Sequence, residues 1–286
     1  MPGYLTKREQ VAIAGVRDLT ICSLLDRQQY ADPLGEAERR GISSASWPHF
    51  GLLWPSGAWL AARLARRPVT PGERILEIGC GLALASLVGH RRGADVTASD
   101  CHPLAEHFLL ENLRLNHLPP MTYRHGQWGS PGMPPRGGDA GTGHVVEGCY
   151  DLIIGSDLLY ERDADGALAA FIGAHAAPAA EIWIIDPDRG NRPAFHRAMD
   201  GRGFRVDEER IVRPALAGAA AYKGRMLTYT NRILVDTGEN DHRLPPLHHD
   251  VQQFGTVYDT IAGETQREGR VERGSMPSCL PCADRS

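Results

Sequence analysis

Short apolar runs alternate with longer amphipathic runs from Arg74 to about residue 202. Apolar runs bounded by turn residues predict buried strands, and apolar residues at helical spacing predict helices. The expected strands cover 73–79, 94–100, 121–126, 150–157 and 180–187, and the expected helices cover 82–93, 103–116, 163–175 and 191–202.

Alternating β and α units predict an α/β fold, in which a mostly parallel sheet is covered by helices on both faces. Two further β-rich runs, 204–211 and 226–235, follow with only a small-residue loop between them. Because a parallel crossover needs an intervening helix, we expect these two strands to pair antiparallel. The Gly- and Pro-rich segment 130–149 is expected to be a flexible surface insertion.

The regions that flank this pattern differ from it in composition. Residues 1–70 are expected to form an N-terminal helical and aromatic extension that packs on the core, with helices near 11–26 and 57–67. Residues 71–236 hold the β/α core. Residues 237–286 are polar and lack sustained periodicity, which predicts a disordered or loosely attached tail.

Composition excludes several classes of protein. With 286 residues, 42% of them hydrophobic, the chain is long enough for one sizeable domain. A formal charge of −4 and a pI near 6.3 argue against a nucleic-acid partner for the chain as a whole. We find neither an apolar run long enough to span a membrane nor a signal peptide. Six scattered cysteines suit the reducing cytoplasm better than a disulfide scaffold.

The strongest motif is ILEIGCGLALASL (75–87), in which a strand turns through Gly79 and Gly81 into a helix. Glycines at such a turn let the backbone approach a ligand closely. Ligands of open α/β sheets bind at this carboxyl edge, and Asp100 ends the next strand, where an acidic side chain can accept ribose hydroxyls. The plain alternative is a strand, turn and helix without a ligand.

Two residues argue against a nicotinamide or flavin dinucleotide at this turn. Leu84 replaces the third glycine of the dinucleotide fingerprint. Glu77 places a negative charge beside the pocket, which is unfavourable near a pyrophosphate. That charge suits a ligand that carries an ammonium and a sulfonium, as S-adenosylmethionine does, and the ribose of that ligand would meet Asp100.

These residues carry a resemblance to a known family. The pattern E-x-G-C-G-L followed by an acidic strand end resembles the seven-β-strand, Rossmann-like (class I) methyltransferases. Three segments are similar to one branch of them, the protein-lysine methyltransferases called methyltransferase family 16: FGLLWPSGAWLAARLA (50–65), FLLENLRLN (108–116) and SDLLY (156–160). The similarity spans roughly residues 45–235.

The resemblance implies a seven-stranded sheet, S-adenosylmethionine as the cofactor and a D-x-x-Y motif at the substrate rim. That motif corresponds to Asp157 and Tyr160, which we therefore predict to be catalytic. Ser156 is assigned to the cofactor side. Trp54 and Gly57 either plug the core or form a turn over the cofactor, and the resemblance favours the cofactor.

Two residues near the ends of the third and fifth expected strands have more than one possible role. Trp128 follows the third strand, where its indole packs either on the adenine of a cofactor or on the protein as a loop anchor. Asp186 ends the fifth strand and either lines the substrate mouth or, as we prefer, forms an ordinary turn with Pro187.

The C-terminal tail holds histidines and a C-x-x-C pair that suggest a metal site: His242, His248, His249, Cys279 and Cys282. A single C-x-x-C without a matching second pair is weak evidence, and we predict no metal.

The segment after the fourth strand limits which kinds of group could accept the methyl group. Methyltransferases that act on adenine or on glutamine amides share an [Asn/Asp]-Pro-Pro-[Tyr/Phe] turn there, whereas 156–160 has no proline. We therefore predict a protein methyltransferase with a protein substrate, acting on lysine. The alternatives are a small-molecule N- or O-methyltransferase and a non-catalytic module that binds S-adenosylmethionine or a protein.

Overall fold

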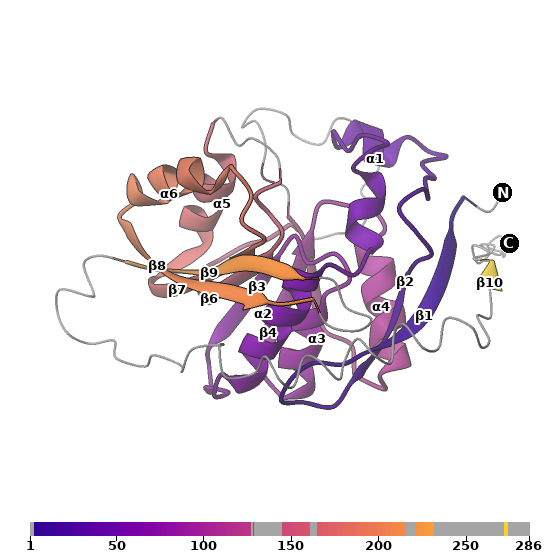
Figure 1. The fold of residues 1–286 in the computed structure, drawn as a ribbon, viewed down its shortest axis with the longest axis horizontal. Coiled ribbons are helices and arrows are strands. Elements are labelled where there is room, and N and C mark those ends of the chain that lie inside the picture. Colours follow the sequence, from indigo (N-terminus) through magenta and orange to yellow (C-terminus); the bar gives the residue numbers. More distant parts are fainter. Residues whose placement is uncertain are drawn as a thin grey trace, which may run out of the picture.

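The computed structural model of the chain describes residues 3–126, 128, 145–160, 165–215, 221–231 and 272–273. Its main sheet has seven strands in the order β5-β4-β3-β6-β7-β9-β8 (Figure 1). These strands are β3 (Arg74–Ile78), β4 (Asp95–Asp100), β5 (Thr122–His125), β6 (Tyr150–Ser156), β7 (Ala176–Asp186), β8 (Phe204–Arg213) and β9 (Tyr222–Asn231).

The direction of the strands confirms the predicted fold class. Strands β5, β4, β3, β6 and β7 pair in parallel, while β9 pairs antiparallel with both β7 and β8. Only eight residues separate the end of β8 from the start of β9, which is too few for the crossover that a parallel pairing needs. The fold is an α/β, Rossmann-like sheet of seven strands with an antiparallel C-terminal pair.

Both faces of the sheet are buried. Successive side chains along a strand point to opposite faces, so one strand can contribute to both hydrophobic clusters. In β6, Leu152 and Ile154 join the hydrophobic cluster on one face, and Ile153 joins the cluster on the other. This arrangement explains why the parallel strands read as continuous apolar runs in the sequence.

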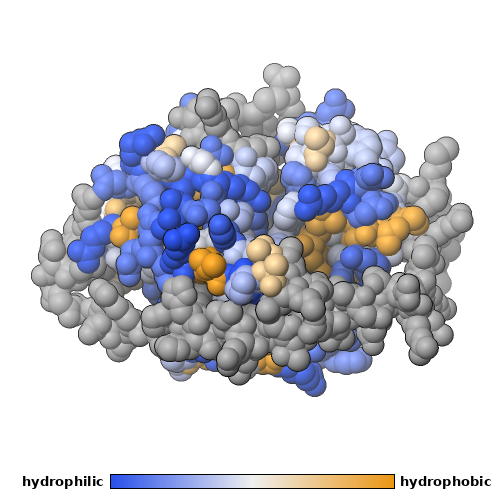
Figure 2. All heavy atoms as spheres, in the orientation of Figure 1, coloured by the Kyte–Doolittle hydropathy of each residue, from blue (hydrophilic) through white to orange (hydrophobic). Residues whose placement is uncertain are grey.

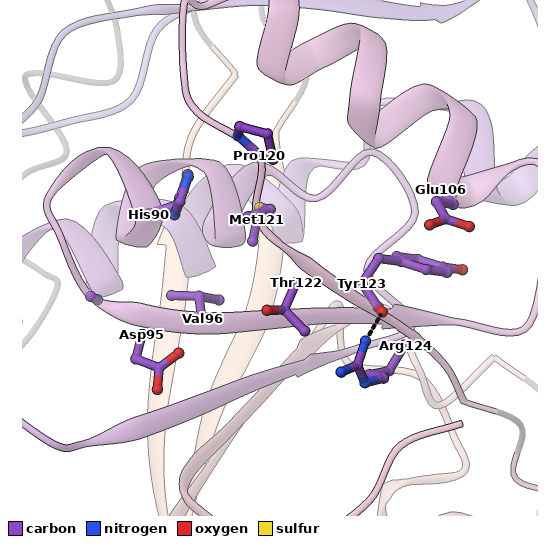
Figure 3. A pocket seen from close by; sticks show the side chains of 10 residues that line it. His90, Asp95, Val96, Glu106, Pro120, Met121, Thr122, Tyr123 and Arg124 are labelled. Atoms are coloured by element: carbon purple, nitrogen blue, oxygen red, sulfur yellow. Dashed lines mark hydrogen bonds between the residues drawn. The ribbon is translucent and has the colours of Figure 1, made fainter. Parts of the chain in front are cut away.

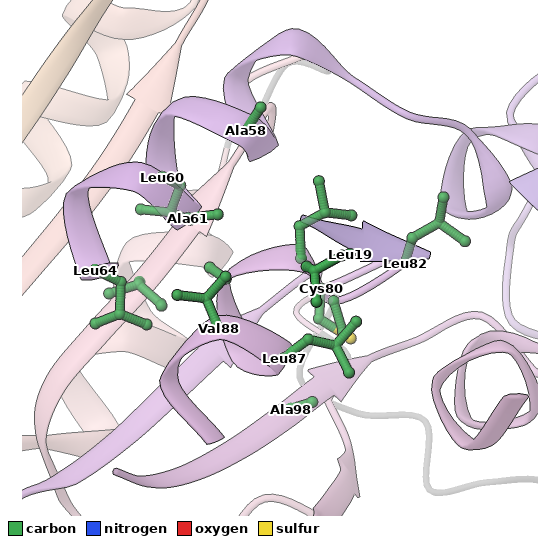
Figure 4. Packing of buried hydrophobic residues seen from close by; sticks show 14 of the residues in the cluster. Leu19, Ala58, Leu60, Ala61, Leu64, Cys80, Leu82, Leu87, Val88 and Ala98 are labelled. Carbon is green, nitrogen blue, oxygen red and sulfur yellow. The ribbon is translucent and has the colours of Figure 1, made fainter. Parts of the chain in front are cut away.

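Helices cover each face. The helices α2 (Pro55–Arg66), α3 (Leu84–Arg91) and α4 (Ala105–Leu115) contribute to one cluster, and α5 (Ala167–His175) and α6 (Arg192–Asp200) contribute to the other. Figure 4 shows Leu64 of α2 beside Val88 of α3, while Leu87 of α3 points toward Ala98 of β4. The face turned toward the viewer in Figure 2 is mainly hydrophilic, with separate small apolar patches.

The prediction of a helix near 11–26 is wrong. The strands β1 (Leu5–Val11) and β2 (Leu19–Leu24) form an antiparallel hairpin there, and β10 (Glu272–Arg273) pairs with β1. The apolar residues of LTICSLL fit either a helix or a strand by spacing alone, and Gly15, with φ of +87°, forms the turn between the two strands. The short helix α1 (Glu36–Arg39) and the 3₁₀ helix η1 (Trp47–Gly51) follow.

Asn112 of α4 and Asn116, the C-cap of that helix, hold β2 against the core. The Asn112 side-chain oxygen accepts a hydrogen bond from the Cys22 backbone N–H at 2.7 Å, and the Asn116 oxygen accepts one from the Thr20 N–H at 2.9 Å. Asn112 and Asn116 lie four residues apart, on one face of the helix. They satisfy backbone donors of β2 that lie buried or partly buried against the helix.

The order of the strands places a crevice at one edge of the sheet. Strand β3 lies between β4 and β6, so the chain runs outward on one side from β3 through β5 and then returns to the other side for β6 and β7. The carboxyl ends of β3, β4 and β6 meet at this reversal, which is the usual ligand site of an open α/β sheet.

Two of the predicted segments consist mostly of residues that the structure does not describe. Most of the insertion at 130–149 and the tail at 237–286, apart from residues 272–273, lie outside the described residues. The division of the chain at residue 70 stays a prediction. In the part that the structure describes, no helix has the length and apolar character needed to cross a membrane.

Candidate functional site

The glycine turn after β3 has the conformation that only glycine adopts readily. Gly79 and Gly81 have φ of +56° and +51°. A Cβ on Gly79 would lie 2.5 Å from a Leu158 methyl and 3.1 Å from the Trp128 ring, and a Cβ on Gly81 would lie 2.7 Å from the Phe50 carbonyl oxygen. The turn is therefore packed from both sides. Trp128 lies beside it, and both interpretations of Trp128, as an adenine contact and as a loop anchor, stay open.

Asp100, at the end of β4, is bonded to this turn. Its Oδ2 accepts a hydrogen bond from the Gly81 N–H at 2.8 Å, and its Oδ1 accepts one from the His102 N–H at 2.8 Å. Asp100 is 6% exposed, and burial raises its pKa against the opposing effect of these backbone donors. Cys101 also donates to this carboxylate. The predicted bond from Asp100 to a ribose stays a prediction.

His102 is a neighbour that the sequence reasoning missed. Its ring stacks on Phe50, with the ring centroids 3.6 Å apart, and burial lowers its pKa to about 3, so it is neutral near pH 7. Nδ1 accepts a hydrogen bond from the Leu104 N–H, which places the proton on Nε2. That buried N–H has no hydrogen-bond partner among the described residues, so a polar donor is available beside Asp100.

Glu77 lies beneath the glycine turn and is 3% exposed. Its Oε2 accepts hydrogen bonds from both the backbone N–H and the hydroxyl of Ser86, in the first turn of α3. Burial raises the pKa of Glu77 to about 7, and the two bonds from Ser86 oppose this shift. The carboxylate thus joins β3 to the N-terminal end of α3, where the helix dipole favours negative charge. Its predicted contact with a cofactor stays a prediction.

The first turn of α2 faces the end of β6. A Cβ on Gly57 would lie 3.7 Å from the Ser156 hydroxyl, so the predicted residues Gly57 and Ser156 are neighbours. Trp54 immediately precedes the helix, and its indole N–H donates to the His49 carbonyl at 2.8 Å. The structure therefore places Trp54, Gly57 and Ser156 along one side of the crevice.

Asp157 follows β6 in a left-handed conformation with φ of +58°. Its Oδ1 is 2.9 Å from Nη2 of Arg189, and its side chain is only 11% exposed. Burial raises the pKa of Asp157, and the Ser56 hydroxyl and the Arg189 guanidinium oppose this shift. The buried Oδ2 has no hydrogen-bond partner among the described residues. A carboxylate is thus held in a costly position with acceptor capacity left over.

Asp186 ends β7 beside Asp157. Its Oδ2 accepts a hydrogen bond from the Arg189 backbone N–H at 2.8 Å, which is the turn chemistry that we preferred. Asp186 is nevertheless fully buried, and its Oδ1 has no hydrogen-bond partner in the described part of the chain. Burial raises its pKa, and the negative charge of Asp157 raises it further. The turn therefore brings a second carboxylate to the site.

Sequence reasoning also missed Ser56, Arg189 and Tyr222. The hydroxyls of Ser56 and Tyr222 lie 2.9 Å apart, and both residues are buried. A Cβ on Gly224 would lie 2.5 Å from the Tyr222 hydroxyl, so the glycine leaves room for that ring. Residues 56 and 222 lie far apart in the chain, and no local pattern could have joined them to Asp157.

Tyr160 lies on the rim and is 48% exposed. Its ring packs edge-on against His49 at 5.7 Å, and His49 packs edge-on against Trp54 at 5.6 Å. The guanidinium of Arg27 lies over the Trp54 ring at 5.2 Å. Tyr160 is thus part of an aromatic row along the crevice, and its predicted approach to an acceptor held by Asp157 stays a prediction.

A cavity of about 590 Å³ lies elsewhere, at the outer edge of β5. Figure 3 shows His90, Asp95, Glu106 and Tyr123 around it, from α3, β4, α4 and β5. None of the predicted site residues lines this cavity. It is open at the edge of the sheet and away from the crevice at the carboxyl ends.

The sequence suggests a metal site only through residues of the tail, and no metal was predicted. Within the residues that the structure covers, no group of three or more His, Cys, Asp or Glu side chains is arranged to hold a metal ion. His242, His248, His249, Cys279 and Cys282 lie outside the described residues.

Comparisons with known proteins were made of both sequence and structure. No family model matches the chain. It is 29% identical over 162 residues to the electron transfer flavoprotein beta subunit lysine methyltransferase of Danio rerio, a match that covers 52% of this chain and 56% of the relative. It is 28% identical over 141 residues to the histone-arginine methyltransferase METTL23 of Homo sapiens, covering 46% and 67%. The first match thus spans little more than half of the relative's length.

The fold has a counterpart among solved structures. A candidate SAM-dependent methyltransferase from Streptococcus mutans matches with a TM-score of 0.50 and 10% identity, covering 78% of this chain and 55% of that chain. At that identity the match concerns the fold alone. The two sequence relatives confirm the predicted resemblance to the protein methyltransferases.

Proposed function

We propose that the chain is an S-adenosylmethionine-dependent methyltransferase that transfers a methyl group to a protein side chain, and that the acceptor is lysine. One observation carries the proposal: the glycine turn and Asp100 lie at the ends of β3 and β4, and Asp157 lies at the end of the adjacent strand β6. A cofactor site and an acceptor carboxylate would therefore share one edge of the sheet.

The residues of the crevice fit the cofactor. Gly79 and Gly81 form a left-handed turn at the carboxyl end of β3, which is where an open α/β sheet binds its ligand. Asp100 ends the strand where an acidic side chain can accept ribose hydroxyls, and His102 offers a buried N–H that has no hydrogen-bond partner among the described residues. We assign Trp54, Gly57, Glu77, Gly79, Gly81, Asp100, Trp128 and Ser156 to the cofactor. When bound, S-adenosylmethionine supplies a methyl group that is already activated on a sulfonium.

The chain's own part is to position the acceptor and to handle its proton. The Asp157 carboxylate accepts hydrogen bonds from the nitrogen of the acceptor and compensates its charge. Because an ordinary lysine has a pKa near 10.4, its ammonium must lose a proton before its lone pair is available. A carboxylate whose pKa is raised by burial accepts that proton more readily than an exposed one does. Tyr160 on the rim offers a ring face to the incoming cation.

The names of the relatives support a protein acceptor. One relative is named a lysine methyltransferase and another a histone-arginine methyltransferase. Asp157 with its unpaired oxygen favours a compact ammonium, so we prefer lysine to arginine. We also place the protein in the cytoplasm, since Cys22, Cys80, Cys101 and Cys149 are thiols rather than halves of disulfides.

Transfer of labelled methyl groups tests the proposal. Purified protein and methyl-labelled S-adenosylmethionine are added to lysate from a strain that lacks the gene, and the products are separated by size. We expect the label in one or a few protein bands, and mass spectrometry should find methyl-lysine in them. Label only in low-mass species would favour the small-molecule enzyme. Cofactor binding with no transfer at all would favour the non-catalytic module.

A further inference from the structure

We infer that Arg189 is a displaceable counter-ion in the acceptor site, and that the acceptor amine binds by taking the place of its guanidinium beside Asp157 and Asp186. The inference rests on the proposed function and adds a residue that controls access to the acceptor carboxylate. It also specifies the ligand chemistry: a compact alkylammonium carried by a larger molecule.

Arg189 occupies the place that a cationic acceptor would need. Its Nη2 pairs with Asp157 Oδ1 at 2.9 Å, and its Nη1 donates to the Asp157 carbonyl at 3.3 Å. The Arg189 side chain is 29% exposed, while that of Asp157 is 11% exposed. The guanidinium is therefore more exposed than the carboxylate with which it pairs, and an amine that binds Asp157 Oδ1 has to replace Arg189 there.

The backbone of Arg189 stays anchored if its side chain leaves. Asp186 Oδ2 accepts a hydrogen bond from the Arg189 N–H at 2.8 Å. This bond belongs to the turn after β7 and does not involve the guanidinium. The side chain can thus rotate toward solvent while the turn and both carboxylates remain in place.

Two other arginines near this turn each have two ion-pair partners in the described part of the chain, one more than Arg189 has. Arg192 and Arg225 each pair with both Asp188 and Glu208. Arg189 has a single ion-pair partner, Asp157, among the described residues. Since the four groups around Arg192 and Arg225 balance one another in charge, neither arginine is available to replace Arg189 on Asp157.

The two carboxylates of the site, Asp157 and Asp186, can bind a second cation in addition to Arg189. Asp157 and Asp186 together carry two negative charges when ionised, and Arg189 compensates one of them. Asp157 Oδ2 and Asp186 Oδ1 are both buried without a hydrogen-bond partner in the described part of the chain. An alkylammonium has three N–H donors around one compact centre, whereas the donors of a guanidinium lie in one plane. An ammonium therefore suits two acceptors that come from different strands.

A tethered counter-ion discriminates between acceptors. Because Arg189 is part of the same chain, it competes at a high effective concentration. A free amine must displace it with the energy of the ammonium alone, while a lysine in a protein gains binding energy from its surroundings. Arg189 thereby disfavours free amines as substrates.

Binding of butylammonium to the cofactor-free protein tests the inference without any methyl transfer. Calorimetry would compare wild type with Arg189→Ala, Arg189→Lys and the control Arg192→Ala. If Arg189 pairs with Asp157 about nine-tenths of the time, removing it should tighten butylammonium binding about tenfold. Arg189→Lys should lie close to wild type, and Arg192→Ala should change the affinity less than about threefold. Equal or weaker binding by Arg189→Ala would overturn the inference, and so would an equal gain in Arg192→Ala.

Methylation of free amines gives the second readout and separates this inference from the proposed function. Arg189→Ala should raise kcat/KM for N-acetyl-lysine amide about tenfold, mainly through KM, with the affinity for S-adenosylmethionine unchanged. If wild type methylates a protein lysine but Arg189→Ala shows no such gain, this inference fails and the proposed function stands. If wild type binds S-adenosylmethionine but methylates no protein, the proposed function fails, and the butylammonium result alone decides the role of Arg189. Thermal unfolding checks that Arg189→Ala is folded, and Arg189→Gln replaces it if it is not.

Discussion

The Asp100 carboxylate accepts a hydrogen bond from the backbone N–H of Gly81 at 2.8 Å, so the end of β4 and the turn after β3 form one unit. The acid that is proposed to hold the ribose therefore also fixes the loop that approaches the rest of the cofactor. A change at Asp100 should affect both the ligand and the loop.

Replacing Asp100 by alanine should weaken binding of S-adenosylmethionine by about 1–3 kcal/mol, the scale of charge-assisted hydrogen bonds. Asp100→Asn keeps the size of the side chain and one oxygen, so it should lose less. Calorimetric titration measures both variants. Unchanged affinity in Asp100→Ala would refute the ribose assignment.

Gly81→Ala should destabilise the protein by about 2–4 kcal/mol, because it combines left-handed backbone strain with overpacking. The new Cβ would lie 2.7 Å from the Phe50 carbonyl oxygen, a backbone atom that cannot rotate away. Gly93→Ala is the matched control, since Gly93 has φ of +86° but open space around it. Urea unfolding compares the two. A loss in Gly81→Ala no larger than that in Gly93→Ala would contradict the packing of the turn.

Glu77 makes the stability of the protein depend on pH. Its pKa is about 7 in the folded state and near the ordinary value of 4.5 when unfolded, so the folded state holds its proton over this range. Stability therefore falls as pH rises from about 4.5 to 7, and the neutral Glu77→Gln should avoid this loss of about 3 kcal/mol.

Urea unfolding at pH 5 and pH 8 measures the difference between wild type and Glu77→Gln. The variant should gain relative to wild type at pH 8, since glutamine can still accept the two hydrogen bonds from Ser86. If the difference between the two proteins is the same at both pH values, the raised pKa of Glu77 is wrong.

Asp157→Ala should abolish methyl transfer while leaving the affinity for S-adenosylmethionine within a few-fold, because we propose that Asp157 holds the acceptor rather than the cofactor. Asp157→Asn should also lose transfer, since an amide neither compensates the ammonium nor accepts its proton. Transfer assays and calorimetry on the same preparations separate the two effects. A large loss of cofactor binding would move Asp157 to the cofactor side.

Local patterns were enough to predict the sheet and the turn at Gly79 and Gly81. Strands that are buried on both faces read as apolar runs, and a glycine turn at a strand end leaves its own signature. The hairpin around Leu19–Leu24 could not be found this way. Its buried donors are satisfied by Asn112 and Asn116, about ninety residues further along the chain.

The acceptor side of the site was also only partly predictable, because some of its residues come from distant parts of the chain. Asp157 could be identified because the resemblance to the methyltransferases implies a D-x-x-Y motif after this strand. Arg189 and Tyr222 reach the same place from the turn after β7 and from β9, so their role depends on strand order. Asp186 looked like part of an ordinary turn, and it is one, but the parallel pairing of β6 with β7 also places it beside Asp157.

A crystal structure with bound S-adenosylhomocysteine tests the central claim most directly, because it locates the cofactor relative to Asp100 and Asp157. We predict the ribose hydroxyls within hydrogen-bonding distance of the Asp100 carboxylate and the sulfur between the glycine turn and the end of β6. Ligand bound in the cavity at the outer edge of β5, or with its ribose away from Asp100, would contradict the account.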